Sequence, residues 1–122
     1  MAAIRYFVND VDRSIVFYTQ HLGFKLERQI GQAIANVSRD DLTLWLSGPE
    51  SSAARPMPDG RRPEPGGWNR LLLEVDDVAS RVAELKQAGI HFLGEIVGGP
   101  GGKKILVEDP DGNPVELFEP AS

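Results

Sequence analysis

The chain of 122 residues contains an internal repeat, and a repeat limits the folds that are open to a chain of this length. The segment "VNDVDRSIVFYTQHLGFKL", which begins at Val8, resembles the segment "VDDVASRVAELKQAGIHFL", which begins 67 residues later. Asp10 matches Asp77 at this offset, whereas Gly23 matches Gly89 at an offset of 66. The repeat predicts one structural unit that occurs twice, with a second helix one residue shorter than the first.

The first copy predicts a strand, a helix and three further strands. "AIRYFV" alternates and is rich in residues that favour strands. Asp10 is a typical helix N-cap, apolar residues at helical spacing run from Val11 to Leu22, and Gly23 stands where helices often end. The short segments "FKLERQ", "QAIANV" and "LTLWLS" follow as three extended pieces, separated by turn residues.

The second copy repeats this order. "RLLLEV" predicts a strand, and a helix follows from its cap at Asp77 to Gly89. Val78, Val82 and Leu85 line one face of that helix. "IHFLGEIV", "KKILVE" and "PVELFE" predict three more strands. We therefore predict an α+β fold in which two βαβββ modules form a cupped mixed sheet, because one face of each sheet is left uncovered by its helix.

These units predict a single domain over residues 1–122, with module one at 1–48, a loop at 49–67 and module two at 68–120. The loop is dense in Pro, Gly, Ser and Arg and has no periodic pattern. It is either a solvated linker or a lid over the cup, and the cup is built either within one chain or across a dimer.

Composition excludes several classes of protein. A formal charge of −5 argues against nucleic-acid binding, which requires a basic surface. The absence of cysteine excludes disulfides, thiolate metal sites and cysteine nucleophiles. The sequence has neither a long apolar run that would span a membrane nor a signal-peptide pattern, so we expect no membrane partner and a cytoplasmic location.

The paired units, the segment "VNDVDRSIVFYTQHLGF" and the closing segment "DPDGNPVELFEP" resemble the vicinal oxygen chelate superfamily. This superfamily contains glyoxalase I, the bleomycin-resistance proteins and the extradiol dioxygenases. The resemblance implies paired βαβββ modules in a cupped sheet, commonly assembled as a homodimer. It does not choose between lyases, dioxygenases and binding proteins without catalytic activity, because one fold supports many functions.

The resemblance also implies where catalytic members bind a divalent metal, namely through His, Gln and Glu on the first and last strand of each module. The family pattern places a histidine seven residues before the capping aspartate, and here those positions hold Ala3 and Arg70. The last-strand position of module one is Thr43 or Trp45, depending on register, and that of module two is Glu116. One carboxylate is too few for such a site. We predict no cofactor, with Glu116 the one weak candidate ligand if a divalent metal is bound.

Strand alternation selects the side chains that face away from the helices and toward the cup. The predicted ligand-binding residues are Arg5, Phe7, Trp45, Trp68, Arg70, Glu74, Glu116 and Phe118. Arg70 is expected near Glu116, so that its guanidinium takes the place of the positive charge of a metal. The pair of Arg70 and Glu116 is then either a structural ion pair or part of a binding site. Alternatively, Arg5 or Arg70 receives an anionic group while the aromatic rings contact its apolar part.

Three functions follow from these residues. The first is a small-molecule-binding protein that takes an aromatic or anionic compound in the cup without the family's metal site. The second is a metal-dependent lyase or dioxygenase whose rearranged ligand set includes Glu116. The third is a dimeric structural module whose cup has no ligand. No catalytic residue is predicted.

Overall fold

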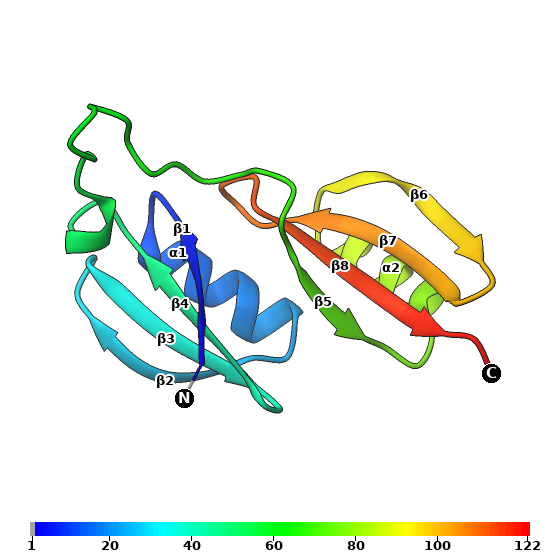
Figure 1. The fold of residues 1–122 in the computed structure, drawn as a ribbon. Helices are drawn as coiled ribbons and strands as arrows, with labels where there is room; N and C mark the ends of the chain where they lie inside the picture. The colour runs from blue at the N-terminus through cyan, green and yellow to red at the C-terminus, as the bar shows by residue number, and fades with distance from the viewer. Residues whose placement is uncertain (1) are drawn as a thin grey trace. The chain divides into compact units, whose positions relative to one another are not determined.

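The computed structural model describes residues 2–122, which divide into two compact units (Figure 1). The first unit ends at Gly66 and the second begins at Gly67. Each unit contains one four-stranded sheet and its own helical segment. We call the elements β1 to β4 with their helix module one, and β5 to β8 with theirs module two.

Module one follows the predicted order of strand, helix and three strands. Its elements are β1 (Ile4–Phe7), α1 (Val11–Val16), η1 (Phe17–His21), β2 (Lys25–Ile30), β3 (Ile34–Arg39) and β4 (Leu42–Ser47). The strands lie in the order β1-β4-β3-β2, with β1 parallel to β4 and the other pairs antiparallel. The loop after β4 contains one short 3-10 turn, η2 (Ser52–Ala54).

Module two repeats this topology. Its elements are β5 (Leu71–Glu74), α2 (Val78–Gln87), β6 (Phe92–Gly99), β7 (Gly102–Glu108) and β8 (Pro114–Pro120). The order is β5-β8-β7-β6, and β5 is parallel to β8. Two βαβββ modules confirm the predicted fold class. No helix within residues 2–122 is long and apolar enough to cross a membrane.

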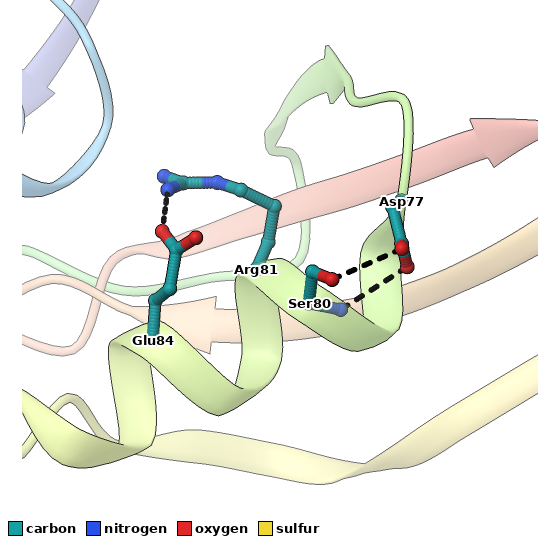
Figure 2. A network of polar contacts seen from close by, with 4 residues as sticks. All are labelled: Asp77, Ser80, Arg81 and Glu84. Atoms are coloured by element: carbon teal, nitrogen blue, oxygen red, sulfur yellow. Dashed lines mark hydrogen bonds and ion pairs between the residues drawn. The ribbon is translucent and has the colours of Figure 1, made fainter.

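Both predicted N-caps are confirmed. Asp10 Oδ1 accepts a hydrogen bond from the amide of Arg13 at 3.1 Å. Figure 2 shows that Asp77 accepts two, from the amide of Ser80 at 3.1 Å and from its hydroxyl at 3.0 Å. These two bonds lower the pKa of Asp77, because they stabilise its ionised form.

The first helical segment is not α-helical throughout, which corrects the prediction. Its last five residues, Phe17–His21, form a π-helix after the six residues of α1, whereas α2 has ten residues. A π turn accommodates an additional residue, so it accounts for the change of offset within the repeat. Both segments end at a glycine with positive φ, Gly23 at 75° and Gly89 at 79°, as predicted. Within α1, Ser14 is fully buried, whereas Ile15 is only half-buried.

Strand alternation is confirmed in both cores. The helix-covered face of module one buries Tyr6, Val8, Ala35, Val37, Leu44 and Leu46. That of module two buries Leu71, Leu73, Ile105, Val107, Val115 and Leu117. Ile4 has the same parity as Tyr6 and Val8 but is 42% exposed, because it opens an edge strand that has a neighbour on one side only.

Candidate functional site

The register of the parallel strand pairs settles which residues are equivalent in the two modules. Arg5 lies opposite Trp45 in the β1–β4 pair, and Leu72 lies opposite Glu116 in the β5–β8 pair. Arg5 and Leu72 are equivalent in the sequence repeat, at an offset of 67. Trp45 is therefore the counterpart of Glu116, and Thr43 is not.

The carboxylate of Glu116 is paired with Arg70, as predicted. Nε and Nη2 of Arg70 donate to Oε1 of Glu116 at 3.0 and 2.9 Å. The Glu116 side chain is 8% exposed and that of Arg70 is 29% exposed. Two charge-assisted hydrogen bonds compensate for the burial of the carboxylate, which is costly without a partner.

The four positions that correspond to the family's metal ligands do not fit a metal. They hold Ala3, Trp45, Arg70 and Glu116, of which only Glu116 is a ligand type. Its carboxylate already binds a guanidinium, which keeps its positive charge at all physiological pH values. Within residues 2–122, no three His, Cys, Asp or Glu side chains are grouped so that they could hold a metal ion.

In module one, a cation and aromatic rings lie together around Trp45, the counterpart of Glu116. The guanidinium carbon of Arg5 lies 5.2 Å from the centre of the Trp45 ring, within the range of a cation–π contact. Nη1 of Arg5 donates to Oγ of Ser47 at 3.0 Å, and Phe7 lies opposite Ser47 in the sheet. Among the residues that the structure describes, Arg5 has no carboxylate partner. These contacts bring Arg5, Phe7 and Trp45 together on one face.

Two polar atoms on this face are buried without a hydrogen-bond partner in the described part of the chain. They are Oδ1 of Asn36 and Nε1 of Trp45, whose residues lie opposite one another in the β3–β4 pair. Such atoms are uncommon in folded proteins, and a bound molecule or water usually satisfies them. Asn36 and Ser47 are not among the residues predicted from the sequence. Alternation places both on the same face as Trp45, but a small polar residue within a strand carries no further signal.

The remaining predicted residues lie in module two. Glu74 and Phe118 are opposite one another in the β5–β8 pair, two residues along from Leu72 and Glu116 on the same face. Leu72 is 52% exposed and adds apolar surface to this face. Trp68 precedes β5 and is 78% exposed, so its part in binding stays a prediction.

A cavity of about 190 Å³ lies in module one, at the carboxyl ends of the parallel strands β1 and β4. Phe7 and Ser47 line it from the strands, and Arg62 lines it from the loop that follows β4. The loop therefore covers part of its own module. Of these three residues, the sequence analysis named Phe7 as ligand-binding and left the role of the loop open.

A family model, the Glyoxalase/Bleomycin resistance protein/Dioxygenase superfamily, matches residues 1–117. The chain belongs to this superfamily. The resemblance inferred from the repeat and the closing motif is thereby confirmed.

Relatives of this chain differ in function. Lactoylglutathione lyase of Salmonella typhimurium is 34% identical, and the match covers 92% of this chain and 86% of that enzyme. A probable chloroplastic lactoylglutathione lyase of Arabidopsis thaliana is 30% identical over 98% of this chain, which spans only 35% of the plant protein. The crystal structure of TnmS3, an antibiotic-binding protein from Streptomyces sp. CB03234, superimposes with a TM-score of 0.69 at 27% identity, over 99% of this chain and 97% of that one.

Proposed function

We propose that this protein binds an aromatic or anionic small molecule on the helix-free faces of its modules, without the metal of the family's catalytic members. The observation that supports this most strongly is the ion pair between Arg70 and Glu116. In this pair Glu116, the one carboxylate at the four ligand positions, neutralises the positive charge of Arg70. A metal ion at Glu116 would have to displace the guanidinium and find further ligands nearby.

Arg5 is the better candidate to receive an anionic group. Arg70 is neutralised by Glu116, whereas Arg5 has no carboxylate partner within residues 2–122. The Trp45 ring beneath Arg5 and the hydroxyl of Ser47 beside it hold the guanidinium in place. A cation that is oriented in advance loses less conformational entropy when it binds a ligand. The neighbouring ring of Phe7 offers a surface for the apolar part of the same molecule.

Module two contributes a different surface. Leu72 and Phe118 lie on the helix-free face of β5 and β8, next to the buried pair of Arg70 and Glu116. We propose that this apolar surface contacts the rings of a ligand bound to module two, while Arg70 and Glu116 fix the local geometry there. The similarity to an antibiotic-binding protein supports a binding function.

A metal-dependent lyase or dioxygenase is the second candidate. The 34% identity to a lactoylglutathione lyase favours it. This function requires ligands other than the four family positions, with Glu116 among them. Both hydrogen bonds from Arg70 end on Oε1 of Glu116, so Oε2 is the oxygen outside the pair.

We further propose that the chain forms a homodimer. The helix-free side of module two exposes large apolar side chains, with Leu72 at 52%, Leu93 at 38% and Val97 at 58%. A second copy would remove these side chains from water, which is favourable in proportion to the apolar area buried. Light scattering after gel filtration should give the mass of two chains, and the mass of one chain at every concentration would contradict the proposal.

A thermal-shift screen of aromatic acids tests the binding function. A ligand that binds only the folded state raises the melting temperature with its concentration. We expect at least one aromatic anion to stabilise the wild-type protein in the presence of a chelator, and the Arg5→Ala variant to lose this stabilisation. Arg61→Ala is the matched control, because the Arg61 side chain is 84% exposed and is already paired with Asp59. Stabilisation that appears only when a divalent metal is added would favour the enzyme instead.

A further inference from the structure

The cavity beneath the loop of module one is a second candidate site, which adjoins the helix-free face of that module and shares Phe7 and Ser47 with it. We propose that it binds a small apolar monocarboxylate, with Arg62 as its anion-binding residue. The inference rests on the cavity and its lining, so it holds whether or not the sheet faces bind the molecule proposed above.

The position of the cavity gives it a fixed wall. It lies where the parallel strands β1 and β4 end, and Gly48 follows β4 directly. A Cβ atom at Gly48 would lie 2.2 Å from the carbonyl oxygen of Gln32 and 2.7 Å from Cγ2 of Val11. The main chain is therefore packed tightly against the start of α1 at this point. Ligand sites at the carboxyl ends of parallel strands are common for the same reason, because the strands fix the backbone there.

The loop that covers the cavity is held by its own hydrogen bonds. The amide of Met57 donates to the carbonyl of Arg61 at 2.7 Å, and the amide of Gly60 donates to the carbonyl of Met57 at 2.8 Å. Arg62 directly follows this closed turn. The Ser51 hydroxyl also accepts from the amide of Ala53 at 3.1 Å and caps η2. This local bonding orders the loop before a ligand arrives, which reduces the entropic cost of binding.

The charge of the cavity points to an anion. Arg62 is the charged residue in its lining, and among the described residues it makes no ion pair. Its neighbour Arg61, by contrast, is neutralised by Asp59, with Nε 2.8 Å from the carboxylate. A planar guanidinium presents paired donors that match the two oxygens of a carboxylate.

The rest of the lining indicates the chemistry of the remainder of the ligand, beyond its anionic group. Six apolar residues form the walls, namely Phe7, Val8, Pro49, Ala54, Pro63 and Pro65. A single cation with apolar walls suits a monoanion that has an apolar body. A phosphate group would bring more charge than one guanidinium neutralises and no apolar surface to bury.

Ser47 supplies a second polar contact. Its hydroxyl oxygen accepts from Nη1 of Arg5 at 3.0 Å, which leaves the hydroxyl proton to donate to a ligand oxygen. The hydrogen bond from Arg5 holds the Ser47 oxygen in place. The ligand carboxylate would then lie between Arg62 and the Ser47 hydroxyl.

The volume limits the size of the ligand. About 190 Å³ is less than the roughly 300–1,000 Å³ of pockets that hold drug-sized molecules. Benzoate is a suitable probe, because it has one carboxylate, one flat ring and few atoms. Benzamide is its matched neutral control.

Amide NMR spectra of the full chain, titrated with benzoate, test the proposal. We expect saturable shifts centred on Asn9, Gly48 and Ala54, with a Kd on the order of 1 mM for so small a ligand. Arg62→Ala should weaken binding about tenfold through loss of a charge-assisted hydrogen bond. Arg61→Ala, one residue away, should leave the affinity unchanged.

Three results would overturn the site: shifts that do not saturate, equal binding of benzamide, or equal binding by the Arg62→Ala variant. The spectra of the free variants show directly whether each is folded. The Arg62→Ala variant also separates this site from the sheet face. Loss of benzoate binding in that variant, with stabilisation by the sheet-face ligand retained, shows that the two sites are independent.

Discussion

In module two the buried strand position holds Glu116, and Arg70 pairs with it through two hydrogen bonds. In module one the equivalent position holds Trp45, and the cation beside it, Arg5, lies over the indole ring. The same frame thus carries an ion pair in one copy and a cation–π contact in the other. Equivalent positions of the repeat therefore lie on the same face of the sheet, but they can hold side chains of different chemistry.

The first amides of the two helices are also bonded by different residues in the two modules. The amide of Val11 donates to Oε1 of Gln32 at 3.0 Å, and the amide of Val78 donates to Oε1 of Glu119 at 2.9 Å. By strand register, Gly48 is the counterpart of Glu119. Module two uses the last strand's own carboxylate, whereas module one has a glycine there and brings in a residue from the β2–β3 turn.

The largest expected effect is from Arg70→Ala, which leaves Glu116 without its partner. Breaking a buried ion pair typically costs roughly 3–5 kcal/mol, and we expect the lower end, about 3 kcal/mol, because Arg70 is partly exposed. Urea unfolding measures this loss. Replacing both residues with leucine should recover much of the stability, since no buried charge is then left unpaired.

Arg61→Ala is the control for that comparison, because its pair with Asp59 at 2.8 Å has side chains that are 84% and 54% exposed. An exposed ion pair contributes at most about 1 kcal/mol. A loss for Arg70→Ala no larger than that of the control would show that the pair in module two is not what stabilises Glu116.

A second prediction concerns the glycine that distinguishes module one. Gly48→Ala would place a methyl group 2.2 Å from the carbonyl oxygen of Gln32, so the β2–β3 turn or the helix must move. We expect a loss of about 2–3 kcal/mol, in the range of overpacked sites, measured by urea unfolding. Gly98→Ala in β6 is the control, because a Cβ there meets no atom within 4 Å. Equal stability of the two variants would contradict the close packing at Gly48.

The smallest effect is the pH dependence of the cap in module two, where Ser80 replaces the Arg13 of module one. Hydrogen bonds from Ser80 hold the pKa of Asp77 below its ordinary value of 3.8. The cap's ionic contribution is therefore complete above that pKa and is lost as the pH falls through the lowered one. Melting temperatures between about pH 2 and pH 6 should show wild type above Asp77→Asn at the upper end, with the two converging in acid. A constant difference across this range would contradict it.

Much of the fold follows from local sequence signals. Both N-caps, both terminal glycines and the alternation of the core strands depend on short-range physical rules, and the structure confirms them. The pairing of Arg70 with Glu116 was also predictable, because strand parity and the repeat place both on one face. The change of offset within the repeat indicated an additional residue in the first helix.

Other features depend on contacts that no single segment encodes. The choice between Thr43 and Trp45 required the register of β1 against β4. The form taken by the additional residue, a π turn over Phe17–His21, has no separate signal in the sequence. The cavity at Arg62 arises from a loop without periodicity, whose path is set by its own turns and prolines.

The central claim is that an arginine stands where the family's metal charge would be. Metal analysis of the purified protein, after incubation with nickel or zinc and gel filtration, tests it most directly. We predict far less than one equivalent of metal per chain, with Glu116→Gln making no difference. One equivalent per chain that is lost in Glu116→Gln would contradict it, because Glu116 would then be a metal ligand and not the partner of Arg70.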